Sequence, residues 1–185
     1  MRLPVFFILL IYSGLSFGVS SKNIELKSPD NNVLVDVCIA DKIKYSVNYG
    51  SKVILLPSAI SMRLKNRLIP GNYPKLKNSR KQLVNQVIYP EIRQKRAKIN
   101  DIYNELELTF KGNCSLIFRA YNDGVAYRFK TAFDEDVTVY DEESAYRFSS
   151  NDTVYFAQVN CDAKPGQDCF HTSFEERYKF YLSVK

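Results

Sequence analysis

Glu105 and Glu107 are a first pair of residues whose types and spacing could do chemistry. They lie in residues 102–110, where apolar and polar residues alternate as in a half-buried strand. Positions i and i+2 of a strand share one face and stand about 7 Å apart. Two carboxyl groups at that separation could act as a general acid and a general base on a substrate bound between them. Adjacent acids on one strand face are usually solvated, however, so we expect these two to neutralise nearby arginines instead.

Arg119 and Arg128 are the arginines that such glutamates could neutralise. They lie in residues 118–129, where two alternating runs flank Asp123 and Gly124. Asp-Gly supplies the positive φ angles of a tight hairpin. With these two residues as the loop, the arginines face each other, on the side opposite the terminal phenylalanines. Facing like charges need an anion or a carboxylate between them, so both an anion site and ion pairs with the strand glutamates stay open, and we favour the ion pairs.

The cysteines and the single histidine offer a third kind of chemistry. Cys161 and Cys169 bracket a polar, turn-rich loop, where a local disulfide and two free thiols are both open. Cys38 and Cys114 lie inside strand-like runs, and we expect buried free thiols there. A zinc site is not expected, because the sequence has no C-x-x-C and only one histidine. His171 is interpreted as a surface residue.

Short strands must position these residues. Residues 33–39, 43–49 and 52–56 are alternating or apolar runs separated by turn residues, which predicts an antiparallel meander. Acidic turns are expected at residues 134–136 and 141–143. A weak helical period appears only in residues 173–181. Many short strands with frequent turns predict an all-β sandwich.

Basic residues dominate residues 63–98, while acids predominate from residue 99 onward, within a net charge of +6. A basic stripe could bind nucleic acid, but no stacking motif interleaves these charges. We therefore expect a solvated sheet edge, on which lysines oppose edge-to-edge pairing, and no nucleic-acid partner.

Residues 1–20 have the character of a signal peptide. Arg2 supplies the positive start, residues 5–12 the apolar run, and small residues near position 18 a cleavage site. The apolar run is shorter than the roughly 20 residues that a spanning helix needs. We therefore expect a periplasmic or secreted protein, without a membrane association after cleavage.

Four segments carry a resemblance to a known family. Residues 28–30, 45–58, 103–106 and 118–129 are similar to motifs of the N-terminal domain of glycoside hydrolase family 97, and the last match is the longest. In that family the domain is a β-supersandwich of the galactose mutarotase-like kind. The resemblance thus implies an all-β supersandwich over residues 21–185, incomplete at the C-terminus.

The resemblance also implies a function. Family members act on α-glucosides or α-galactosides, so an α-linked oligosaccharide would be the substrate. Their catalytic carboxylates lie in a (β/α)8 barrel, on which the N-terminal domain packs. In calcium-dependent members this domain donates one glutamate to a calcium ion at the active site. The matching position here is Glu175, with Glu176 second. We expect no catalysis by this chain alone.

Two alternatives stay open beside this interpretation. A mutarotase-type epimerase would need a histidine acid and a carboxylate base, which a single histidine outside the strands does not favour. A stand-alone carbohydrate-binding sandwich would stack aromatic rings on sugars. Thirteen tyrosines permit such stacking, but the absence of tryptophan weakens it.

Overall fold

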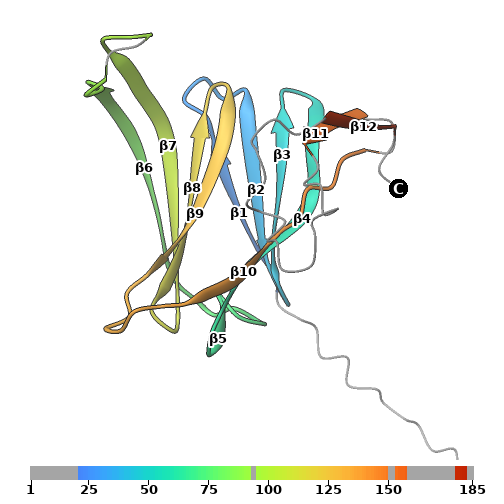
Figure 1. Ribbon diagram of the computed structural model, residues 1–185, viewed down its shortest axis with the longest axis vertical. Coiled ribbons are helices and arrows are strands. Elements are labelled where there is room, and N and C mark those ends of the chain that lie inside the picture. The colour runs from blue at the N-terminus through green and yellow to red at the C-terminus, as the bar shows by residue number, and fades with distance from the viewer. Residues whose placement is uncertain (1–20, 93–94, 150–152, 158–177, 183–185) are drawn as a thin grey trace, which may run out of the picture.

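The computed structural model describes residues 21–92, 95–149, 153–157 and 178–182, and this part of the chain is all β (Figure 1). No helix is present among these residues, so none there is long and apolar enough to cross a membrane. The strands are β1 (Lys22–Lys27), β2 (Val33–Ile39), β3 (Ile43–Tyr49), β4 (Lys52–Leu64), β5 (Arg67–Ile69), β6 (Leu76–Ile88), β7 (Ile99–Phe110), β8 (Cys114–Tyr121), β9 (Gly124–Thr131), β10 (Val139–Ser144), β11 (Thr153–Ala157) and β12 (Tyr178–Leu182).

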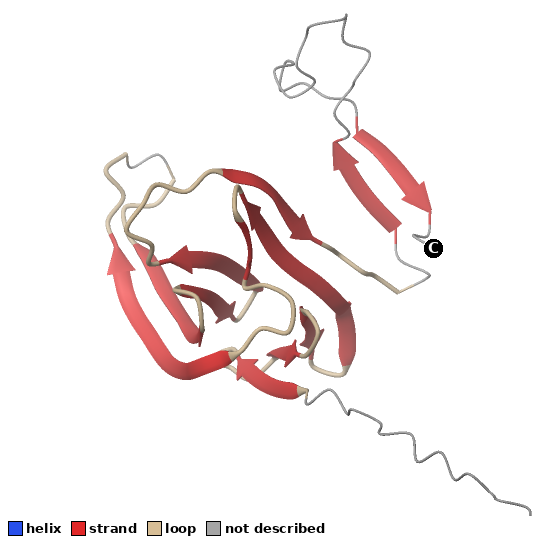
Figure 2. Ribbon diagram, turned by 90° about the horizontal axis from the view of Figure 1, so that it is seen from below, coloured by secondary structure: helices blue, strands red, loops and turns tan. Residues whose placement is uncertain are grey.

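Two antiparallel sheets form a sandwich, seen end-on in Figure 2. The first sheet has the order β1-β2-β3-β4-β10, with β5 paired to β4. The second has the order β6-β7-β8-β9, and β11 pairs with β12 separately. The all-β sandwich that the strand pattern predicted is therefore confirmed.

Alternate side chains of both sheets fill the core between them. Val35 and Val37 of β2 are fully buried, and so are Leu106 of β7 and Phe118 of β8. Each such side chain contributes about 1.5–3 kcal/mol when it leaves water. The predicted meander is confirmed, since β2 pairs with β3 and β3 with β4, both antiparallel. The β3–β4 turn holds Gly50 at a φ of 56°.

The β8–β9 hairpin exists, but its predicted loop is wrong. Tyr121 pairs with Gly124, so Asn122 and Asp123 form the turn and Gly124 begins β9. Moving the loop by one residue shifts the pairing by two positions, which leaves every side chain on its predicted face. The alternation of residues therefore could not distinguish the two registers. The side chain of Asn122 accepts a hydrogen bond from the backbone N–H of Asp30 at 3.1 Å, which ties the turn to the β1–β2 connection.

Two local predictions need correction. The acids Asp141 to Glu143 lie on β10 rather than in a turn, because β10 pairs with β4 along this segment. Asp141 and Glu143 also bond side chains of β4, and Glu143 pairs with Lys42 in the β2–β3 turn. Within residues 173–181, the described part belongs to β12, a strand, and not to a helix. The hydrogen bonds of β12 to β11 explain why the weak helical period did not decide its structure.

The basic block lies where the sequence predicted. Strand β6 is an edge of the second sheet, and most of its residues are exposed. Cys38 and Cys114 are free thiols, as expected, although Cys38 is only half-buried. Burial raises the pKa of the Cys114 thiol. Cys161, Cys169 and His171 lie outside the described residues.

Candidate functional site

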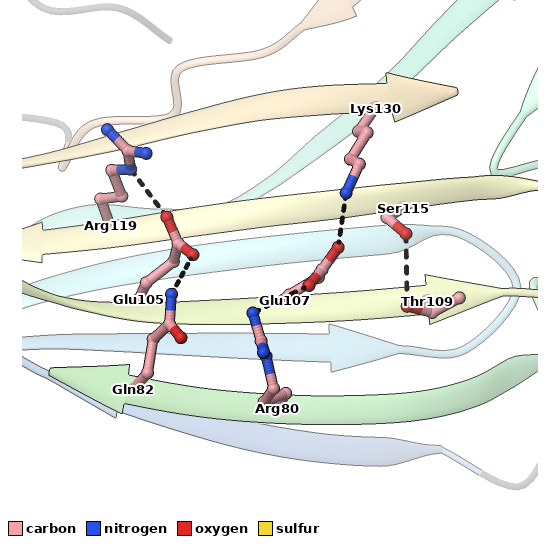
Figure 3. Close-up of polar contacts among 8 residues, drawn as sticks. All are labelled: Arg80, Gln82, Glu105, Glu107, Thr109, Ser115, Arg119 and Lys130. Atoms are coloured by element: carbon pink, nitrogen blue, oxygen red, sulfur yellow. Dashed lines mark hydrogen bonds and ion pairs between the residues drawn. The ribbon is translucent and has the colours of Figure 1, made fainter. Parts of the chain in front are cut away.

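A row of polar side chains crosses the outer face of the second sheet at Glu105 (Figure 3). Its two carboxylate oxygens accept hydrogen bonds from Gln82 of β6 and Arg119 of β8, each at 2.9 Å. The Arg119 guanidinium also lies over the ring of Tyr103, 4.4 Å from its centroid. Glu105 is only 8% exposed. Gln82 and Arg119 hold the carboxylate in one position, and Tyr103 contacts the Arg119 side chain.

A second row runs parallel to the first at Glu107 (Figure 3). One carboxylate oxygen lies 3.7 Å from Arg80 of β6, and the other lies 3.4 Å from Lys130 of β9. The two cations come from opposite edges of the sheet. The row thus links strands that are not neighbours in the sheet.

These two rows of polar side chains are poorly suited to catalysis. Both oxygens of Glu105 and of Glu107 already face donors of this chain, so neither carboxylate is free to protonate a leaving group or activate a water. The prediction that these acids neutralise Arg119 or Arg128 is confirmed for Glu105, which pairs with Arg119. It is wrong for Glu107, which pairs with Arg80 and Lys130 instead. The prediction that Arg119 faces Arg128 is wrong, because Arg119 pairs with Ala126 and Arg128 pairs with Ile117. Among the described carboxylates, none forms an ion pair with Arg128.

A groove of about 740 Å³ opens on the other side of β9, between the two sheets. It is lined by β3, β4, β9, β10 and the residues after β10. Aromatic side chains dominate its wall: Tyr45, Tyr127, Tyr146 and Phe148. The Tyr45 and Tyr127 rings lie 5.7 Å apart.

Three polar side chains of the groove, Tyr127, Glu142 and Ser144, are hydrogen-bonded to one another. The Tyr127 hydroxyl donates to Glu142 of β10 at 2.7 Å and lies 2.9 Å from the Ser144 hydroxyl. Burial raises the pKa of Tyr45 to about 12 and also raises that of Tyr127. Neither phenol therefore exchanges a proton near neutral pH. The groove can hold an apolar or ring-shaped surface, but it offers no evident acid–base pair.

Sequence reasoning did not find this groove. Alternation did place Tyr45 on the buried face of its strand. Glu142, however, was expected in a turn, so nothing brought it to Tyr127. Only the pairing of β10 with β4 places the two side chains together.

A calcium site cannot be built from the described residues. No group of three or more His, Cys, Asp or Glu side chains among them could hold a metal ion. Glu175 and Glu176, to which the resemblance pointed, lie outside the described residues.

The geometry alone does not identify a protein family, but comparison with known proteins does. A model of the family described as Glycosyl-hydrolase 97 N-terminal matches residues 26–184. The chain belongs to glycoside hydrolase family 97. The match is to the N-terminal domain of that family, and it includes β2 to β10 of the sandwich. The resemblance stated from the sequence motifs is confirmed.

Relatives of this family 97 domain include characterised enzymes. A retaining alpha-galactosidase from Bacteroides thetaiotaomicron is 34% identical over 96% of this chain, which spans 27% of that enzyme. The crystal structure of a beta-arabinopyranosidase is similar with a TM-score of 0.71 and 26% identity, over 85% of this chain and 26% of that one. A Glycoside Hydrolase Family 97 enzyme from Pseudoalteromonas sp. in complex with acarbose shares the fold, with a TM-score of 0.63 and 20% identity, over 74% of this chain and 22% of that one. The chain thus spans about a quarter of the length of these relatives.

Proposed function

We propose that this chain is the non-catalytic β-sandwich of a glycoside hydrolase that acts on α-galactosides or α-glucosides. In the whole protein the domain packs on a (β/α)8 catalytic barrel and helps to hold an α-linked oligosaccharide in its active site. The observation that carries the proposal is the 34% identity to a retaining alpha-galactosidase over nearly the whole chain. Cations of this domain already pair with Glu105 and Glu107, which supports a non-catalytic role for the domain.

Calcium belongs to the same proposal. Glu175, or Glu176 in its place, supplies one oxygen ligand of a calcium ion in the whole protein. Calcium takes six to eight oxygen ligands, so the remaining ones come from elsewhere. Such a cation would act as a Lewis acid on an oxygen of the substrate. The chain's own part is to position one carboxylate.

The test compares the full-length protein with residues 21–185 alone, using p-nitrophenyl α-galactoside and α-glucoside. We expect turnover of at least one substrate by the full-length protein and none by residues 21–185. We also expect that Glu175→Gln raises the calcium concentration needed for half-maximal activity, while Asp136→Asn at an exposed position leaves it unchanged. Turnover by residues 21–185 would overturn the proposal, and so would a full-length protein inactive on both substrates.

A carbohydrate-binding module without catalysis is the second candidate. The aromatic wall of the groove at Tyr45 and Tyr127 favours it, since aromatic rings offer flat apolar surface. Titration calorimetry with α-linked oligosaccharides separates the two functions. Binding by residues 21–185 that Tyr146→Ala weakens would support the module.

Export is proposed from residues 1–20 alone. Removal of this segment before Val19 or Ser21 would deliver the protein to the periplasm or the medium. N-terminal sequencing of the mature protein checks the proposal, and an intact Met1 in the exported fraction would contradict it.

A further inference from the structure

Arg128 differs from the other cations around the two polar rows on the outer face of the second sheet. It is exposed on β9, and none of the described carboxylates pairs with it. Each of the other cations pairs with a glutamate of these rows: Arg80, Arg119 and Lys130. The positive charge of Arg128 is therefore available to a ligand.

Arg119 brings a second guanidinium to the same place. It pairs with Ala126 across the β8–β9 hairpin. Arg128 follows Ala126 by two residues on β9, so the two arginines are diagonal neighbours on one face. Diagonal positions of an antiparallel pair lie about 7–8 Å apart, within reach of long side chains. The hydrogen bond from Arg119 to Glu105 leaves from Nε, and its terminal nitrogens extend toward β9 (Figure 3).

A pocket of about 120 Å³ is lined by both arginines. Its lining residues are Ile117, Arg119, Tyr121, Ala126, Tyr127 and Arg128, and none of them is acidic. Ile117 is 3% exposed and supplies apolar surface, while Ala126 is too small to fill the space opposite Arg119. The pocket volume is about four times the roughly 30 Å³ that one molecule occupies in liquid water. A small charged group therefore has room between the arginines.

We propose that Arg119 and Arg128 form a binding site for the carboxylate group of a small molecule. A guanidinium presents its donors in a planar fork that matches the two oxygens of a carboxylate. The two arginines and Glu105 together carry one net positive charge, which a carboxylate balances and a doubly charged sulfate or phosphate exceeds. The Tyr121 ring, which contacts the Tyr103 ring with centroids 4.9 Å apart, lines the pocket beside them. This site goes beyond the proposed glycosidase function and does not depend on it.

Titration calorimetry of the full-length protein tests the inference with four probes: acetate, D-glucuronate, neutral D-glucose and sulfate. We expect both carboxylates to bind, and Arg128→Gln to weaken their binding by about ten-fold or more, because charged hydrogen bonds are lost. Lys52→Gln removes the same charge from an exposed position on the first sheet and should change the affinity less than about two-fold. Ala126→Leu keeps both arginines but fills the pocket, so it should also abolish binding.

The outcomes separate this site from the glycosidase function. Equal affinities for acetate and D-glucuronate would support a site for the carboxylate alone, while tighter binding of D-glucuronate would support a site for sugar acids. Absence of binding by both carboxylates would overturn the inference, and so would tighter binding of sulfate or of D-glucose. An Arg128→Gln variant with unchanged affinity would overturn it as well. Loss or retention of α-glycoside turnover does not enter any of these results.

Discussion

The carboxylate of Glu105 is almost inaccessible to water, so the stability of the domain depends on the groups that pair with it. An ion pair on the surface contributes little, because water and salt screen it. A buried charge that loses its partner keeps its desolvation cost. Glu105 is 8% exposed and Arg119 supplies its cationic partner. The identity of these partners is therefore a question of stability more than of chemistry.

Arg119 and Arg128 give a matched pair of substitutions on one hairpin. Arg119→Leu removes the cation from Glu105 and the contact with the Tyr103 ring, and we expect it to lower the free energy of unfolding by about 1–3 kcal/mol. Arg128→Leu breaks no ion pair with the described residues, and its cost should stay below about 0.5 kcal/mol. Urea denaturation of residues 21–185 measures both. Equal costs would show that Arg128 also carries a structural charge.

Some strands and turns of this domain could be predicted from the sequence more completely than others. The strands and their buried faces follow from alternation, so residues 33–39 and 102–110 were placed correctly. The loop of the β8–β9 hairpin was not, because a two-residue shift keeps every face unchanged. The acids of β10 were expected in a turn, because an exposed edge strand has no buried alternation to reveal it. Its backbone pairing with β4 holds that strand in the sheet instead.

Substitutions at two glycines test the register of the β8–β9 hairpin. Gly50 has a φ of 56°, which is strained for a residue with a Cβ, although no atom blocks the space. Gly50→Ala should therefore lower the free energy of unfolding by about 1 kcal/mol. Gly124 lies at the start of β9 without a positive φ and in equally open space. Gly124→Ala should be neutral or slightly stabilising. A cost at Gly124 as large as that at Gly50, in the same urea measurement, would favour the loop predicted from the sequence.

The whole molecule is held together by contacts that no local pattern contains. Tyr45 of the first sheet meets Phe118 and Tyr127 of the second, at 5.6 and 5.7 Å between ring centroids. The alternation of residues on each strand does not show which rings meet, because that depends on how the two sheets are placed. The groove beside β9 escaped prediction for the same reason.

Because the Tyr45 phenol is buried in this packing, it makes the stability of the fold depend on pH. Burial raises its pKa from 10.0 to about 12 in the folded protein. As the pH rises, Tyr45 therefore loses its proton in the unfolded chain before it does so in the folded protein. The stability that results from this difference is fully present below pH 10. That contribution is lost as the pH rises from 10 to about 12. Tyr45→Phe removes the ionisation but keeps the ring, so the urea midpoint should fall less steeply over this interval.

The control for this prediction is Tyr140→Phe, at a tyrosine that is 58% exposed. The two variants share every other ionisable group, so the difference between their pH profiles isolates the two phenols. We expect Tyr140→Phe to follow the original protein at every pH. Parallel profiles for the two variants would mean that Tyr45 ionises as freely in the folded state as in the unfolded chain. The contact between the sheets would then be open to water at this ring, and the closed sandwich would not describe the molecule there.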